Sequence, residues 1–129
     1  NDLTQYLLAV DRNNARVADM YDGLHPAVLR ALQQIIQTAN QQAKPVSVCG
    51  ELAGDPIGVL ILLAMGYRRF SMNLNNIAKI KYLLRRVRTD ALEPLLAQAI
   101  QLNDSAQIRK IFSAYLESLG LQSFLSKKA

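Results

Sequence analysis

The stretch KPVSVCGELAGDPIGVLILLAMGYRRFSMN at residues 44–73 decides the fold. Residues 46–50 form a β-branched run between a proline and a glycine, which predicts a short strand. After a loop, residues 57–65 are apolar on nearly all sides, which predicts a buried helix. Residues 69–72 read as a second short strand. Strand, helix and strand in such close succession predict a right-handed crossover between two parallel strands.

Helices are predicted on both sides of this unit. Pro26 opens the clearest one, with His25 at its cap position, and Lys44-Pro45 ends it. Its apolar face carries Val28, Leu29, Leu32, Ile35, Ile36 and Ala39. Apolar spacing predicts three further helices, at 75–88, 90–102 and 104–119. Residues 3–10 fit a short helix or a strand equally well, because periodicity does not separate the two over so short a run.

Two parallel strands are too few for a sheet of their own, because parallel sheets are covered on both faces and need several neighbours. We therefore expect an α/β, helix-rich chain that is the C-terminal portion of a (β/α)8 TIM barrel, an incomplete barrel of about half the usual ~250 residues. The chain would form one unit over 1–129, with the last βα units in 1–88 and terminal helices in 89–129. The absence of an initiator methionine agrees with a fragment of a longer protein.

Composition narrows the class of protein. With 50% apolar and 19% charged residues, the 129-residue chain can fill a core, which excludes intrinsic disorder. The longest strictly apolar run, 59–65, is far shorter than the ~20 residues of a membrane span. One cysteine excludes a disulfide framework and a multi-cysteine zinc site, and it fits a reducing, cytoplasmic setting.

Charge gives no strong indication of a partner. The net charge of +5 is compatible with simple solubility. The basic residues of 75–88 are best read as a solvated face, and with Tyr82 as its single aromatic residue this helix does not favour nucleic acid.

In a barrel, functional side chains follow the carboxyl ends of the strands. Those positions are Cys49 to Glu51 after the first strand, Asn73 after the second, and Asn1-Asp2 at the start. Cys49 is either a small buried apolar residue or an acid or nucleophile at the barrel mouth. Asp2 and Glu51 are either solvated carboxylates or a Mg2+ site. Arg12 is either an exposed loop residue or a clamp for a phosphate or carboxylate group.

Longer motifs make the pattern specific. Four segments stand in order: NDLTQYLLAVDRNN at 1–14, YDGLHPAVLRAL at 21–32, CGELAGDP at 49–56 and GYRRFSMN at 66–73. Together they resemble phosphoenolpyruvate–protein phosphotransferase, enzyme I of the bacterial phosphotransferase system. AVDRNN, RVADMYDGLHPAVLRAL and NNIAKIKYLLRR are more similar to its nitrogen-related branch. Phosphoenolpyruvate synthases and pyruvate phosphate dikinases share the NDLTQ start, but they differ around the cysteine loop and the SMN segment.

This resemblance implies roles for individual residues. Asn1 and Asp2 match a pair that contacts phosphoenolpyruvate, and Asp2 also matches a Mg2+ ligand. Arg12 matches a substrate-binding arginine and Cys49 the proton donor. Glu51 has no metal role in the family, so its pairing with Asp2 is not supported there.

The family transfers the phosphoryl group to a histidine on another domain, which His25 does not match, and then to a small carrier protein. The fragment alone is therefore expected to be inactive. An alternative is a non-catalytic helical dimerisation module built from 90–119. The open barrel edge predicts either association of the chain into homo-oligomers or repacking of helices across the gap.

Overall fold

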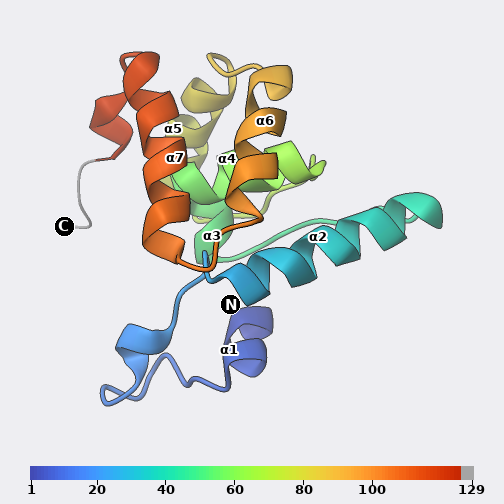
Figure 1. Ribbon diagram of the computed structural model, residues 1–129, viewed down its shortest axis with the longest axis vertical. Coiled ribbons are helices and arrows are strands. Elements are labelled where there is room, and N and C mark those ends of the chain that lie inside the picture. The colour runs from blue at the N-terminus through green and yellow to red at the C-terminus, as the bar shows by residue number, and fades with distance from the viewer. Residues whose placement is uncertain (126–129) are drawn as a thin grey trace.

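Helices dominate the structure, a computed structural model that describes residues 1–125 (Figure 1). The last four residues of the predicted terminal helical region lie outside this range. In chain order the helices are α1 (Asp2–Leu8), η1 (Ala18–Met20), α2 (Pro26–Gln41), α3 (Glu51–Gly54), α4 (Pro56–Met65), α5 (Leu74–Leu84), α6 (Thr89–Ala99), α7 (Ser105–Ser118) and η2 (Gln122–Phe124).

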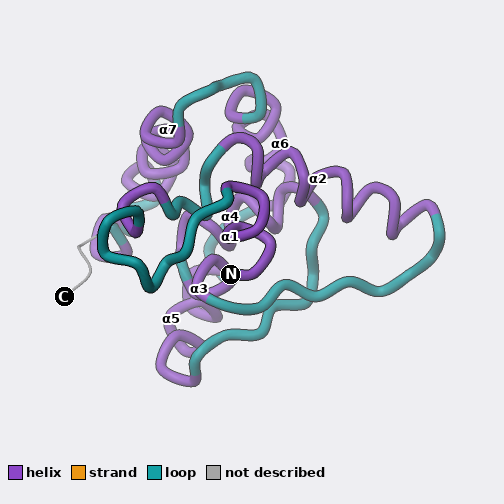
Figure 2. The backbone as a smooth tube through the Cα atoms, turned by 90° about the horizontal axis from the view of Figure 1, so that it is seen from below, coloured by secondary structure: helices purple, strands orange, loops and turns teal. Residues whose placement is uncertain are grey.

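The two predicted strands are wrong as elements. Within residues 1–125 no strand forms, and the tube in Figure 2 carries no strand colour. What remains is one isolated parallel bridge between Val48 and Phe70. In it the Val48 N–H donates to the Arg69 carbonyl at 3.0 Å, and the Ser71 N–H donates to the Val48 carbonyl at 2.8 Å. The predicted parallel direction is therefore present, but no neighbouring strand among the described residues extends it into a sheet.

The segment after the bridge, predicted as a loop, contains the short helix α3. Gly50 precedes it with φ 86° and ψ −160°, a backbone conformation that is essentially restricted to glycine. Asp55 then caps α4, because its carboxylate accepts a hydrogen bond from the Ile57 N–H at 3.3 Å. Gly66 ends α4 in the left-handed conformation.

Helix α4 forms the centre of the core, as its all-round apolar sequence predicts. Every residue from Pro56 to Leu62 is buried, and α6 and α7 both pack against α4 (Figure 1). The buried positions that α6 and α7 contribute are Leu92, Leu96, Ala99, Ile108, Phe112 and Leu116. Among the described helices none combines the length and the apolar character needed to cross a membrane.

Helix α2 follows the predicted pattern with one exception. The His25 Nδ1 accepts from the Ala27 N–H at 3.2 Å and caps the helix, as predicted. The buried side is Val28, Leu29, Leu32 and Ile36. Ile35, predicted for the same face, is 41% exposed, because the described chain covers a narrower stripe of α2 than the sequence pattern spans. Ile77 on α5 is exposed to a similar degree, at 40%.

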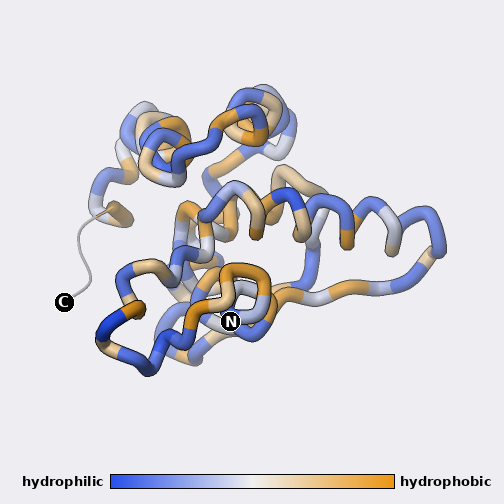
Figure 3. Tube along the Cα trace, turned by 60° about the horizontal axis from the view of Figure 1, so that its bottom comes forward, coloured by the Kyte–Doolittle hydropathy of each residue, from blue (hydrophilic) through white to orange (hydrophobic). Residues whose placement is uncertain are grey.

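Residues 3–10 were predicted as either a helix or a strand, and the structure has a helix there, α1 (Asp2–Leu8), which packs against α2. Ala9 ends α1 with φ 53°, in the left-handed region. The outer side of α1 exposes Leu3, Tyr6 and Leu7, and the tube around the N label is largely orange in Figure 3. This short helix therefore carries apolar side chains on the surface.

Candidate functional site

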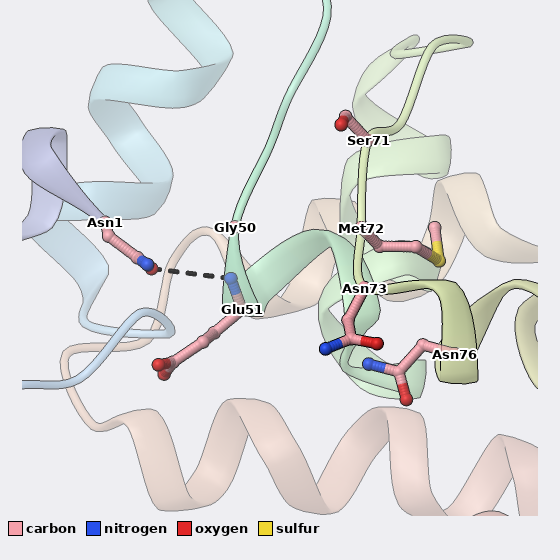
Figure 4. Close-up of a pocket in the computed structure, with 7 residues that line it drawn as sticks. All are labelled: Asn1, Gly50, Glu51, Ser71, Met72, Asn73 and Asn76. Carbon is pink, nitrogen blue, oxygen red and sulfur yellow. Dashed lines mark hydrogen bonds between the residues drawn. The ribbon is translucent and has the colours of Figure 1, made fainter.

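An open hollow of about 410 Å³ lies where three distant parts of the chain meet. Asn1 contributes one side, the start of α3 a second, and the segment leading into α5 a third (Figure 4). Its lining residues are Asn1, Gly50, Glu51, Ser71, Met72, Asn73 and Asn76. Each of the three segments that were predicted to follow barrel strands thus contributes at least one residue to the lining of this hollow.

The side chain of Asn1 is fixed by two hydrogen bonds to its carbonyl oxygen. Oδ1 accepts from the Tyr21 hydroxyl at 2.9 Å and from the Glu51 N–H at 3.4 Å, and Figure 4 draws the second bond. Burial raises the pKa of Tyr21, and a hydrogen bond with the Thr4 side chain lowers it in part. Asn1 is therefore tied both to the segment before α2 and to the start of α3.

Gly50 allows Asn1 to come this close. A Cβ atom on Gly50 would lie 3.0 Å from Oδ1, 3.1 Å from Cγ and 3.2 Å from Nδ2 of Asn1. The Asn1 amide is therefore packed closely on the glycine, and a side chain there would have to displace it. The positive φ of Gly50 is a second, independent reason for glycine at this position.

Arg12 approaches the hollow through Glu51. Arg12 Nη1 lies 3.4 Å from Glu51 Oε1, and the Arg12 N–H donates to Gln5 Oε1 at 3.1 Å. The residue-based pairing of Asp2 with Glu51 is thus not what the structure favours, since the Glu51 carboxylate pairs with Arg12 instead. Asp2 lies exposed in the first turn of α1, and within residues 1–125 no group of three or more His, Cys, Asp or Glu residues could hold a metal ion.

Cys49 is exposed and immediately precedes Gly50 and Glu51. The alternative in which Cys49 is a small buried apolar residue is therefore wrong. Of the four predicted site residues, Asn1 lines the hollow, whereas Asp2, Arg12 and Cys49 lie outside its described lining.

Comparison with known proteins places the chain in a family. A family model described as PEP-utilising enzyme, PEP-binding domain, matches residues 1–89. The chain belongs to this family. A "Phosphoenolpyruvate-dependent phosphotransferase system" protein of Salmonella typhimurium is 46% identical over 121 residues, 94% of this chain and 16% of the relative.

Two other relatives have similar names. A "Phosphoenolpyruvate-protein phosphotransferase" of Cupriavidus necator is 45% identical over 104 residues, 81% of this chain and 18% of the relative. A "Multiphosphoryl transfer protein 1" of Escherichia coli is 41% identical over 115 residues, 89% of this chain and 14% of the relative. These matches confirm the resemblance to phosphoenolpyruvate–protein phosphotransferases. The chain spans less than a fifth of the length of each relative.

The sequence patterns did not single out the lining residues Ser71, Met72 and Asn76, nor Tyr21, which bonds to Asn1. Tyr21 lies in the YDG segment between two predicted elements, and nothing local links it to Asn1. Asn76 lies on α5 close to Gly54, where an added Cβ would approach Asn76 Nδ2 to 2.6 Å. Gly54 in the ELAG segment was the sequence signal for this close approach of Asn76 to the backbone.

Proposed function

We propose that this chain is the C-terminal part of an enzyme that transfers the phosphoryl group of phosphoenolpyruvate to a histidine of its own and then to a small carrier protein. One observation carries the proposal. In a domain of the PEP-binding family, the Asn1 amide meets the Gly50–Glu51 turn at an open hollow. Its Oδ1 atom lies 2.9 Å from the Tyr21 hydroxyl oxygen and 3.4 Å from the Glu51 backbone nitrogen.

The fold proposal is a cut barrel. The parallel bridge at Val48, followed by α4 and then by Phe70 and α5, has the chain order of two strand–helix units. Residues 1–88 would be the last such units and 89–129 the terminal helices of one domain. In the complete barrel, strands from the rest of the protein would extend the bridge into a sheet.

The proposed ligand contacts follow from charge and donor type. Phosphoryl transfer depends mainly on positioning and on neutralising negative charge. Arg12 and the Asn1 amide would bind the substrate, because guanidinium and amide N–H groups donate to phosphate and carboxylate oxygens.

Asp2 would provide one oxygen ligand to Mg2+, an ion that usually takes one or two protein carboxylates besides substrate phosphates and water. The donor chemistry of Asp2 fits, but the described residues do not complete a metal site. When bound, Mg2+ would neutralise phosphate charge.

Cys49 would act as the general acid. Loss of the phosphoryl group leaves the enolate of pyruvate, whose methylene carbon must gain a proton. The Cys49 S–H bond would break, a C–H bond would form at that carbon, and a thiolate would remain until it regains a proton from solvent. The exposure of Cys49 beside the hollow-lining Gly50 supports this role, since the thiol is open to a ligand.

The test uses the full-length protein that contains this chain. Pyruvate formation from phosphoenolpyruvate is followed in the wild type and in Cys49→Ala, with Ser47→Ala as the matched control, because Ser47 is also exposed and two residues away. Removing a general acid should lower turnover about 100-fold or more, and the control should retain wild-type turnover. Unchanged turnover in Cys49→Ala would refute the role of the thiol, and no pyruvate from the wild type would refute the proposed function.

Two alternatives remain. A dikinase or synthase would use the same substrate, and it is distinguished by whether the phosphoryl group finally reaches a carrier protein or a small molecule. A helical dimerisation module is less favoured, because α6 and α7 direct their apolar residues at α4. Light scattering of the chain tests the expected homo-oligomer. A cytoplasmic location and membership of the nitrogen-related branch belong to the same proposal.

A further inference from the structure

We propose that Tyr21 is a positioning residue for the ligand-binding amide of Asn1. The inference rests on the proposed function for the nature of the ligand, phosphoenolpyruvate. Tyr21 does not line the hollow, so it would act through Asn1 and not by touching the substrate.

The hydrogen bonds of Asn1 determine which end of its amide is free. A carbonyl oxygen has two lone pairs, and Asn1 Oδ1 uses them for the Tyr21 hydroxyl at 2.9 Å and the Glu51 N–H at 3.4 Å. Rotating the amide by half a turn would bring its NH2 group against the Glu51 N–H, which can only donate, and would take the carbonyl acceptor away from the Tyr21 hydroxyl. The bonded orientation therefore keeps the NH2 group available as a donor to an anionic ligand in the hollow.

Gly50 restricts the same side chain from another direction. A Cβ there would lie within 3.0 to 3.2 Å of the three amide atoms of Asn1, so the amide rests close to the glycine backbone. Of the two donors to Oδ1, the Glu51 N–H is the longer contact and is fixed by the backbone of α3. The shorter bond comes from Tyr21, a residue 20 positions away in sequence, and it is the contact that a side-chain substitution can remove.

The chemistry of Tyr21 suits this task. Its side chain is partly buried, and burial raises the pKa of its phenol, so the hydroxyl keeps its proton and remains a donor through the physiological pH range. A phenol is also rigid, and its hydroxyl shares a hydrogen bond with the Thr4 side chain as well as bonding to Asn1. Phenylalanine at this position would keep the ring and remove the hydroxyl with its bonds to Asn1 and Thr4, and only the first of these depends on Asn1.

The experiment is a double-mutant cycle in the full-length protein. Tyr21→Phe, Asn1→Ala and the double variant are compared with the wild type for kcat and KM with phosphoenolpyruvate. Tyr21→Phe should lower kcat/KM about three- to tenfold, mainly through KM, which is the effect of losing one neutral hydrogen bond. In the Asn1→Ala background the same change should alter kcat/KM less than twofold. Tyr6→Phe, at an exposed position on α1, is the matched control and should match the wild type.

The outcomes separate the inference from the proposed function. Equal losses from Tyr21→Phe in both backgrounds, or no loss in either, would overturn the positioning role while pyruvate formation by the wild type still upholds the function. If Tyr21→Phe does not fold, Asn1→Asp decides, because it keeps both acceptor bonds and loses the NH2 donor. Asn1→Asp should raise KM about tenfold, and an unchanged KM would overturn the inference.

Discussion

Removing the Tyr67 hydroxyl should change the stability of the chain in a way that reverses with pH. Tyr67 is 1% exposed, and its hydroxyl donates to the Leu32 carbonyl at 2.7 Å, which joins the end of α4 to α2. A buried hydrogen bond of this kind contributes about 1 kcal/mol. Because Leu32 lies inside α2, its carbonyl also belongs to the helical ladder and keeps a partner in Tyr67→Phe. Near neutral pH we therefore expect this variant to be about 1 kcal/mol less stable.

At alkaline pH the order should invert. Burial raises the pKa of Tyr67 from 10.0 to about 12, so the folded state disfavours the charged phenolate. This contribution to stability is fully present below pH 10 and is lost as the pH rises from the unfolded to the folded pKa. A difference of about two pKa units corresponds to roughly 3 kcal/mol, which exceeds the hydrogen bond that the variant lacks. The free energies of unfolding of the wild type and of Tyr67→Phe should become equal at about pH 11, and above that pH the variant should be the more stable.

Urea unfolding followed by circular dichroism from pH 7 to 11.5 measures this difference directly. Tyr6→Phe is the control, because Tyr6 is 86% exposed and its removal should leave the pH dependence of the wild type unchanged. If the wild type exceeds Tyr67→Phe by the same free energy of unfolding at every pH, the reasoning is refuted. Such a result would mean that the phenol ionises equally well in the folded and the unfolded chain.

Three further outcomes are expected. Gly58→Ala should lower the free energy of unfolding by about 2 kcal/mol or more in urea titrations, because its Cβ would lie 2.5 Å from the Leu52 carbonyl oxygen. Asp55→Ala should cost about 1 to 2 kcal/mol by thermal unfolding, since it removes a helix cap and an ion pair, whereas Arg109→Ala removes only the 3.2 Å ion pair and should cost less than about 1 kcal/mol. A hydrogen bond from Arg88 lowers the pKa of Asp90, so the NMR signal of the Asp90 carboxyl group should titrate below the usual range. The stabilising ion pair with Arg88 should be lost as the pH falls through that lowered pKa.

Two helix starts and one helix end follow from local signals in the sequence, whereas the predicted helices at 75–88 and 90–102 end earlier, at Leu84 and Ala99. His25 and Asp55 both cap the helices that follow them, and Gly66 ends α4 with a positive φ. Each of these features depends on a few consecutive residues and on backbone chemistry within one turn. The burial of α4 was also predictable, because a helix that is apolar on every side has no face to offer to water.

Strand formation was not predictable in the same way. The residues around Val48 and Phe70 have the β-branched and aromatic character of strands, yet they form a single bridge. A strand needs a partner on at least one side for several residues, and that partner is a property of the whole sheet. Exposure of Ile35 has a related cause, because an apolar periodicity shows which residues share a face but not how much of that face a neighbour covers.

At the candidate site too, the sequence indicated the residue types but not which side chains would contact each other. Two carboxylates at positions predicted to follow barrel strands suggested a shared metal ion, but the folded chain provides Glu51 with a guanidinium instead, from Arg12 at 3.4 Å. The Arg12 side chain is 37% exposed and that of Glu51 67%, so the ion pair contributes at most about 1 kcal/mol and can be exchanged at small cost. A multiply charged phosphate would compete well for the same guanidinium, since charge-assisted bonds to phosphate can be bidentate. Under the proposed function, Glu51 would hold Arg12 close to the hollow until an anionic ligand replaces it.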